Sequence, residues 1–78
     1  MRIDKFLKVS RIIKRRTVAK EVCDGGKVKI NGRVAKAGTD VAAGDEIQFG
    51  EKIFRARIKE VRETVPAKEA DSLYEVLR

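Results

Sequence analysis

The apolar residues at the start of the chain recur at helical spacing. They predict a first helix from Met1 to about Val9, with one apolar face made by Ile3, Phe6 and Leu7. Ser10-Arg11 predicts a break after this helix. The next two residues, Ile12 and Ile13, are expected to be buried at a joint between two helices.

A second helix is predicted from about Thr17 to Asp24, because apolar residues again lie four apart, as Val18 with Val22 and Ala19 with Cys23. Thr17 is a good N-cap residue, and Gly25-Gly26 supplies the C-terminal stop. The cations Lys14, Arg15 and Arg16 stand immediately before this start. Backbone N–H groups and fixed positive charge are therefore expected at one place, where a phosphate binds well.

After Gly26 the spacing changes from helical to alternating. Asn31-Gly32 separates residues 27–30 from residues 33–34 and predicts a tight hairpin, because both turn positions need positive φ. Residues 37–45 are predicted to form a loop that turns at Gly44-Asp45.

A second hairpin is predicted around a turn at Gly50-Glu51, with apolar residues alternating at Ile47, Phe49, Phe54, Ala56 and Ile58. Its solvent face is expected to carry Arg55, Arg57 and Lys59. Pro66 suits the first turn of a C-terminal helix whose apolar face is made by Leu73, Val76 and Leu77. The expected fold is α+β, with two short N-terminal helices packed on a small twisted antiparallel sheet and a short C-terminal helix.

Charge is divided unevenly along these 78 residues, whose net charge is +7. Residues 1–36 hold twelve Lys and Arg against three Asp and Glu, a sum of +9. Residues 37–78 hold seven Lys and Arg against nine Asp and Glu, a sum of −2. Two interpretations of this charge are nucleic-acid binding and simple maintenance of solubility. Because the positive charge is concentrated in one half of the chain, nucleic-acid binding is favoured.

The residue inventory argues against catalysis. The chain has no His, its carboxylates are scattered, and its six glycines form neither a phosphate-binding-loop nor a dinucleotide pattern. The single cysteine, Cys23, is expected to be a buried helix residue rather than a reactive thiol. We therefore expect no enzyme activity, no cofactor and no metal site. No signal peptide or membrane-length apolar run is present, which predicts a cytoplasmic protein without a membrane partner.

Aromatic residues indicate what kind of nucleic acid is recognised. Phe6, Phe49 and Phe54 fall at predicted core positions, and no exposed aromatic is interleaved with the cations. A base-stacking surface for single strands is therefore not expected, and the basic surface should read backbone and shape. Contact is expected for Arg11, Arg15 and Arg16, because guanidinium groups match phosphate oxygens. Lys27 and Lys52 are expected to be solvated.

Several spaced segments together resemble the S4 RNA-binding domain over roughly residues 1–50: Arg2-Ile3-Asp4-Lys5-Phe6-Leu7, Ser10-Arg11, Lys14-Arg15-Arg16-Thr17-x-Ala19-Lys20, Gly26-x-Val28-x-Ile30-Asn31-Gly32 and Val41-x-x-Gly44-Asp45-x-Ile47. The resemblance implies the S4-type αL fold, in which the two helices and the following hairpin grip structured RNA. It also implies a single S4 domain over residues 1–78, with a helical tail from about residue 66. The expected RNA-binding residues are Arg2, Lys5, Lys8, Arg11, Lys14, Arg15, Arg16, Thr17, Lys20, Lys29, Asn31, Arg33 and Lys36.

The tail at residues 68–77 is more similar to stand-alone quality-control members of this family than to heat-shock members, which carry a longer basic extension. This resemblance implies binding to the large ribosomal subunit, with contacts to large-subunit rRNA and to peptidyl-tRNA. It further implies support of C-terminal alanine tailing by an RqcH-like tailing factor. The protein is expected to act as a monomer.

Three alternatives to this function stay open at the level of sequence. One is a general structured-RNA-binding or targeting subunit that recruits an enzyme through its acidic second half. A second is a heat-shock-type factor that binds stalled large subunits. DNA binding is the third, because composition alone does not separate folded RNA from DNA.

Overall fold

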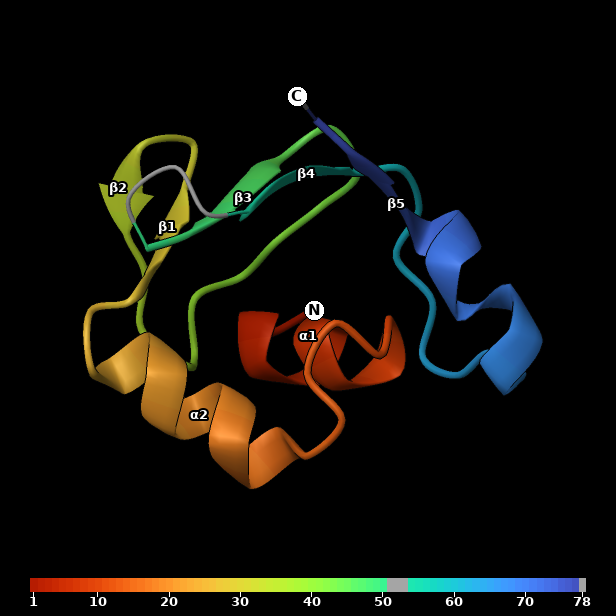
Figure 1. The fold of residues 1–78 in the computed structure, drawn as a ribbon, viewed down its shortest axis with the longest axis horizontal. Helices are drawn as coiled ribbons and strands as arrows, with labels where there is room; N and C mark the ends of the chain where they lie inside the picture. The colour runs from red at the N-terminus through yellow and green to blue at the C-terminus, as the bar shows by residue number, and fades with distance from the viewer. Residues whose placement is uncertain (51–53, 78) are drawn as a thin grey trace.

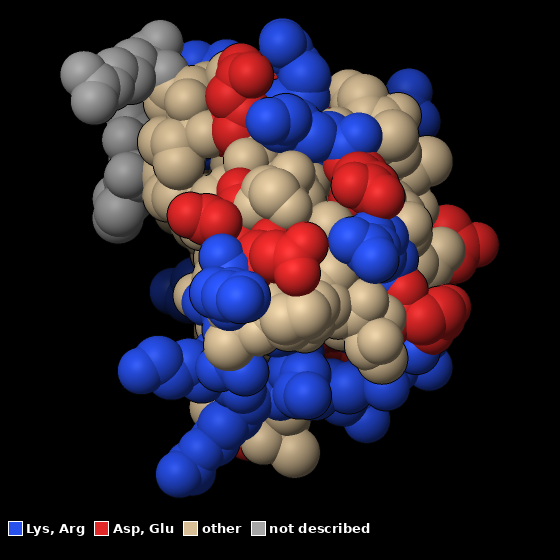
Figure 2. All heavy atoms as spheres, turned by 90° about the vertical axis from the view of Figure 1, so that its right-hand side faces the viewer, with Lys and Arg blue, Asp and Glu red and all other residues tan. Residues whose placement is uncertain are grey.

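The computed structural model describes residues 1–50 and 54–77, and it consists of a helix layer against one face of a sheet (Figure 1). The helix layer is formed by α1 (Ile3–Val9) and α2 (Arg16–Asp24). The sheet is antiparallel throughout, in the order β2-β1-β3-β4-β5. Its strands are β1 (Val28–Ile30), β2 (Arg33–Val34), β3 (Glu46–Phe49), β4 (Phe54–Ile58) and β5 (Tyr74–Val76). Lys and Arg gather over the helix layer, at the lower edge of Figure 2.

Helix α1 has the predicted apolar face, because the side chains of Ile3, Phe6 and Leu7 are fully buried. The predicted break also lies in the expected place, since Ser10 caps the helix and Arg11 follows with a left-handed φ of 61°. Ile12 and Ile13 differ from the expectation: they are only half-buried and pack against the edge of the core.

Helix α2 begins one residue earlier than predicted, and Thr17 is not its N-cap. The N-cap residue is Arg15, whose extended backbone (φ −117°, ψ 130°) ends the preceding loop, and no side chain caps the helix. The C-terminal stop is as predicted. Gly26 adopts a φ of 78°, its N–H donates to the carbonyl of Cys23, and the N–H of Lys27 donates to the carbonyl of Val22. This is the Schellman arrangement, which favours glycine at its left-handed position.

Both predicted hairpins are present. In the first, Ile30 lies opposite Arg33, and the two turn residues Asn31 and Gly32 have φ values of 52° and 84°. Two positive φ angles match the right-handed twist of the flanking strands. In the second hairpin, Phe49 of β3 lies opposite Phe54 of β4. Its predicted turn at Gly50-Glu51 lies partly outside the described residues, and Lys52, which is expected to be solvated, lies wholly outside them.

The predicted C-terminal helix is correct only in its first part. A 3-10 helix, η1 (Ala67–Leu73), buries Leu73, but the chain then becomes extended and adds β5 to the free edge of β4. Val76 is consequently 54% exposed instead of sharing an apolar helix face with Leu73. An open sheet edge offers unpaired backbone groups, and pairing with it overrides the helical spacing of these residues.

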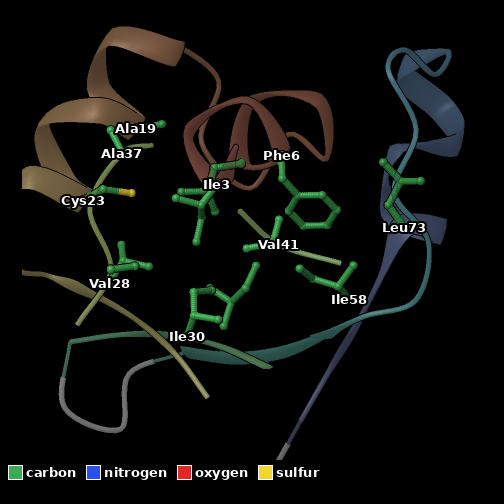
Figure 3. Packing of buried hydrophobic residues seen from close by; sticks show 13 residues of the cluster. Ile3, Phe6, Ala19, Cys23, Val28, Ile30, Ala37, Val41, Ile58 and Leu73 are labelled. Carbon is green, nitrogen blue, oxygen red and sulfur yellow. The ribbon is translucent and has the colours of Figure 1, made fainter. Parts of the chain in front are cut away.

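The core lies between the helix layer and the sheet, and Figure 3 shows side chains from distant parts of the sequence meeting there. Phe6 of α1 points toward Ile58 of β4 and Leu73 of η1, with Val41 beside them. The C-terminal segment therefore packs on the same core as the first helix. None of the helices in the described part of the chain is long and apolar enough to cross a membrane.

Cys23 has the predicted role of a small buried helix residue. Burial, and to a smaller extent the carboxylates of Asp4 and Asp24, raise the pKa of its thiol from an ordinary value of 9.0 to about 11. At pH 8 the thiolate that attacks alkylating reagents is therefore almost absent from the folded protein.

We expect alkylation of Cys23 by iodoacetamide at pH 8 to be at least about a hundredfold slower in native buffer than in 6 M guanidinium chloride. The raised pKa lowers the thiolate fraction, and burial blocks access of the reagent. Mass spectrometry of timed samples measures the rate. Equal rates in the two solvents would contradict both the burial and the raised pKa.

Candidate RNA-binding surface

Two arginines meet at one buried carboxylate. Asp4, in the first turn of α1, is only 2% exposed. Its Oδ1 lies 3.3 Å from Nε of Arg2 and accepts the backbone N–H of Lys5 at 2.8 Å. Its Oδ2 lies 3.4 Å from Nε of Arg16, at the start of α2. One carboxylate thus holds guanidinium groups from two different helix starts side by side.

The two guanidinium groups are anchored but remain available to a ligand. The side chains of Arg2 and Arg16 are 51% and 47% exposed. The backbone around Arg2 is fixed by hydrogen bonds from Ile3 N–H to the Thr39 carbonyl and from Val41 N–H to the Met1 carbonyl, both at 2.8 Å. Thr17 and Lys20 line the same shallow depression. We call Arg2, Arg16, Thr17 and Lys20 the Asp4 cluster.

The start of α2 carries a charge pattern that the isolated helix disfavours. Lys14, Arg15 and Arg16 stand at its N-terminus, its first turn has no acidic residue, and Asp24 lies in its last turn. Because a helix dipole is positive at the N-terminus, each such charge costs about 0.3–1 kcal/mol. An anion bound at this helix start would interact favourably both with the cations and with the positive end of the helix dipole. The uncapped N–H groups of the first turn can bind such an anion.

A second group of cations surrounds the end of α1. Lys8, Arg11 and Lys14 line a pocket together with Glu63, Thr64 and Val65. Glu63 forms an ion pair with Lys5, and the hydrogen bond from Lys5 lowers the pKa of the Glu63 carboxyl. Lys5, an expected RNA contact, is therefore engaged by the protein itself. We call Lys8, Arg11 and Lys14 the loop cluster.

The expected RNA contacts at residues 29–36 do not all lie with the cations of the helices. Lys29 is in register with Gln48, on the sheet face that points away from the helices. Lys36 contacts the carbonyl of Asp24 at the far end of α2, a helix of nine residues and hence about 14 Å long, which separates it from Arg16. Arg2 lies nearer to this segment, because its guanidinium is beside Gly38. Arg33 is exposed.

Asn31 has a structural role. Its amide Nδ2 donates to Asp45 at 3.1 Å, and its Oδ1 accepts the backbone N–H of Glu46 at 3.0 Å. These bonds tie the hairpin turn to the start of β3. Contact of Asn31, Lys29, Arg33 or Lys36 with RNA stays a prediction.

The cations of β4 lie on the solvent face, as predicted. Arg55 and Arg57 are both exposed, and the Arg55 guanidinium donates to Glu46 Oε1 at 2.9 Å. Figure 2 shows how the charges are distributed on one face of the molecule. Blue side chains form a band over the helices, whereas red and blue alternate over the C-terminal segment above them.

Two features of this region were not predicted from the sequence. The burial of the Asp4 carboxylate is one, although its position beside Ile3 on the apolar face of α1 is a signal for it in the sequence. Phe49 and Phe54 were expected in the core, but both are only half-buried. They form an edge-to-face row with Tyr74, with ring centroids 5.6 Å and 6.4 Å apart.

Comparisons with known proteins show the family to which the chain belongs. The family model of the S4 domain matches residues 1–47. An RQC P-site tRNA stabilizing factor of Halalkalibacterium halodurans is 62% identical, covering 97% of this chain and 89% of the relative. The protein of the same name from Bacillus subtilis is 51% identical, covering 100% and 93%.

A solved structure extends the comparison to the fold. Heat Shock Protein 15 of Vibrio cholerae, described as trimeric, is 31% identical and superposes with a TM-score of 0.88, covering 99% of this chain and 81% of that one. The expected αL fold is thereby confirmed, as is the expected resemblance to stand-alone quality-control members. The chain belongs to the S4 domain family, in the branch that contains the RQC P-site tRNA stabilizing factors.

Proposed function

We propose that this chain is a non-catalytic factor that binds the large ribosomal subunit during ribosome-associated quality control. The observation that carries the proposal is the Asp4 cluster, in which Arg2 and Arg16 are held side by side at an uncapped helix start. The bound partners are large-subunit rRNA and peptidyl-tRNA. The factor acts as a monomer in the cytoplasm.

The relatives support the choice of partner. Those most similar over nearly the whole chain are named for stabilising tRNA in the P site during ribosome quality control. A factor that holds peptidyl-tRNA in place supports the addition of C-terminal alanine residues by an RqcH-like tailing factor. The chain itself contributes binding and positioning to that process.

Anchoring of the two arginines lowers the entropic cost of binding RNA. A free arginine loses about 0.5–1.5 kcal/mol of side-chain freedom when it is immobilised at an interface. Arg2 and Arg16 are already restrained by Asp4, so less of this freedom remains to be lost on binding. Their planar guanidinium groups then meet phosphate oxygens in a bidentate geometry, next to the N–H groups of α2.

Arg16→Ala is expected to abolish co-sedimentation with large ribosomal subunits, because one such contact contributes about 1–3 kcal/mol. Arg57→Ala removes the same charge from the solvent face of β4 and should leave co-sedimentation unchanged. Circular dichroism checks that both variants are folded. Wild-type affinity should also fall steeply with salt as counterions are released. If Arg16→Ala sediments with the subunits like wild type, the Asp4 cluster is not the binding surface.

A further inference from the structure

An apolar groove lies next to the loop cluster and has no role in the proposed function. It is lined by Ile12, by Val18 and Val22 of α2, and by the aromatic row Phe49, Phe54 and Tyr74. Its volume of about 470 Å³ falls within the range of sites that hold one small ligand or chemical group. Val18 is 41% exposed there, although it stands on a helix whose other apolar residues are buried or half-buried.

The aromatic row is built as a continuous surface. The rings come from three neighbouring strands, with Phe49 and Phe54 inclined at 61° and Phe54 and Tyr74 at 63°. All three are half-buried, so each ring packs partly against the protein and keeps part of its surface open to solvent. Partly exposed aromatic side chains are what unstacked nucleobases pack against in RNA complexes.

Arg11 connects this groove to the loop cluster. Arg11 lines both the apolar groove and the pocket that is also lined by Lys8 and Lys14. Its φ of 61° is uncommon for a side chain of this size, and the backbone is fixed there by hydrogen bonds from Arg11 N–H to the Lys8 carbonyl and from Ile13 N–H to the Leu7 carbonyl. A left-handed residue held by its neighbours is typical of a functional position.

We propose that the groove receives a single nucleobase displaced from the stack of a bound RNA. The adjoining phosphate lies at Lys8, Arg11 and Lys14. The inference rests on the proposed function and deepens it by naming a structural feature of the RNA, an unpaired nucleotide. It replaces the expectation that the chain lacks a surface for base stacking.

Charge at the mouth of the groove favours a nucleotide over an apolar protein segment. Three cations line the pocket beside it, and Glu63, the one carboxylate among the described residues that line this pocket, is already paired with Lys5. A nucleotide combines a flat, largely apolar base with a charged phosphate. The apolar groove matches the base, and the cation-lined pocket beside it matches the phosphate.

The test uses the full chain with two RNA hairpins that differ only by one bulged adenosine. The bulged hairpin is expected to bind at least about fivefold more tightly, since stacking of one base contributes about that much or more. Methyl NMR should show ring-current shifts of Val18 and Val22 with the bulged hairpin and not with the fully paired one. Val18→Asn, which makes the groove polar without changing charge, should remove the preference. Val34→Asn, at an exposed valine outside the groove, should retain it.

Equal affinity for the two hairpins, without methyl shifts, would overturn the groove proposal while leaving the proposed function intact. In that case Arg16→Ala would still weaken binding of both RNAs. Failure of wild type to bind either hairpin in low salt would count against both proposals. Methyl shifts caused by a purified RqcH-like tailing factor, but by neither RNA, would assign the groove to a protein and overturn the inference.

Discussion

Asp4→Asn is expected to weaken RNA binding about tenfold and to destabilise the fold by about 1–2 kcal/mol. The asparagine can still accept the N–H of Lys5, but it no longer carries the charge that holds Arg2 and Arg16. A hydrogen bond to a charged group contributes about 1.5–3 kcal/mol, and partial exposure of both arginines reduces this.

Two effects of Asp4→Asn on binding oppose each other. Loss of a negative charge favours the approach of phosphate, but at a separation of about 8 Å in water this amounts to only about 0.5 kcal/mol. Loss of restraint on the two arginines costs about 0.5–1.5 kcal/mol for each when RNA immobilises them. The second effect is larger, so the variant should bind more weakly although its surface is more positive.

Asp40→Asn is the matched control, because it also removes one negative charge near Arg2. The Asp40 side chain is 89% exposed and lies 4.0 Å from the N-terminal amine. We expect its RNA affinity to equal that of wild type or to rise slightly. Fluorescence anisotropy with a labelled rRNA fragment measures affinity, and thermal unfolding measures stability. Wild-type affinity in a folded Asp4→Asn variant would contradict the positioning role of Asp4.

Phe6→Ala is expected to lower the free energy of unfolding by about 3–5 kcal/mol. Phe6 is fully buried and lies where α1 meets Ile58 and Leu73 (Figure 3), so its removal leaves a cavity shared by three elements. A domain of this size has a total stability of only about 4–12 kcal/mol. At least about a quarter of the stability should therefore be lost, and all of it if the total lies at the low end of this range.

Urea denaturation followed by circular dichroism measures the effect of Phe6→Ala. Val34→Ala is a suitable control, because Val34 is 56% exposed and its truncation should change stability by less than about 0.5 kcal/mol. The urea midpoint of Phe6→Ala should move far below that of the control. Coincident unfolding curves for the two variants would show that α1 does not pack on the shared core.

The parts of the fold that were predicted correctly depend on local rules. The apolar face of α1 follows from helical spacing, and the first hairpin follows from Asn31-Gly32, whose backbone preferences act within four residues. The stop of α2 at Gly26 is of the same kind. In each case the residues that decide the conformation are neighbours in the chain.

The errors lie where distant segments compete. Helical spacing over residues 67–77 was overridden after Leu73, because the free edge of β4 offered hydrogen bonds to Tyr74 and its neighbours. The predicted N-cap at Thr17 was replaced by a start at Arg16, whose guanidinium pairs with Asp4 from the other helix. Neither partner could be identified from local sequence.

The sequence by itself determined that the first half of this protein is a basic helix-and-hairpin unit, because charge and spacing are properties of the chain, and its motifs resemble the S4 domain. Only the tertiary structure decided which cations act together. It joins Arg2 to Arg16 through a buried carboxylate, places Lys36 at the opposite end of α2 from Arg16, and sets a row of aromatic rings beside Arg11. These relations depend on how the helices pack against the sheet, and packing brings together residues that no local pattern relates.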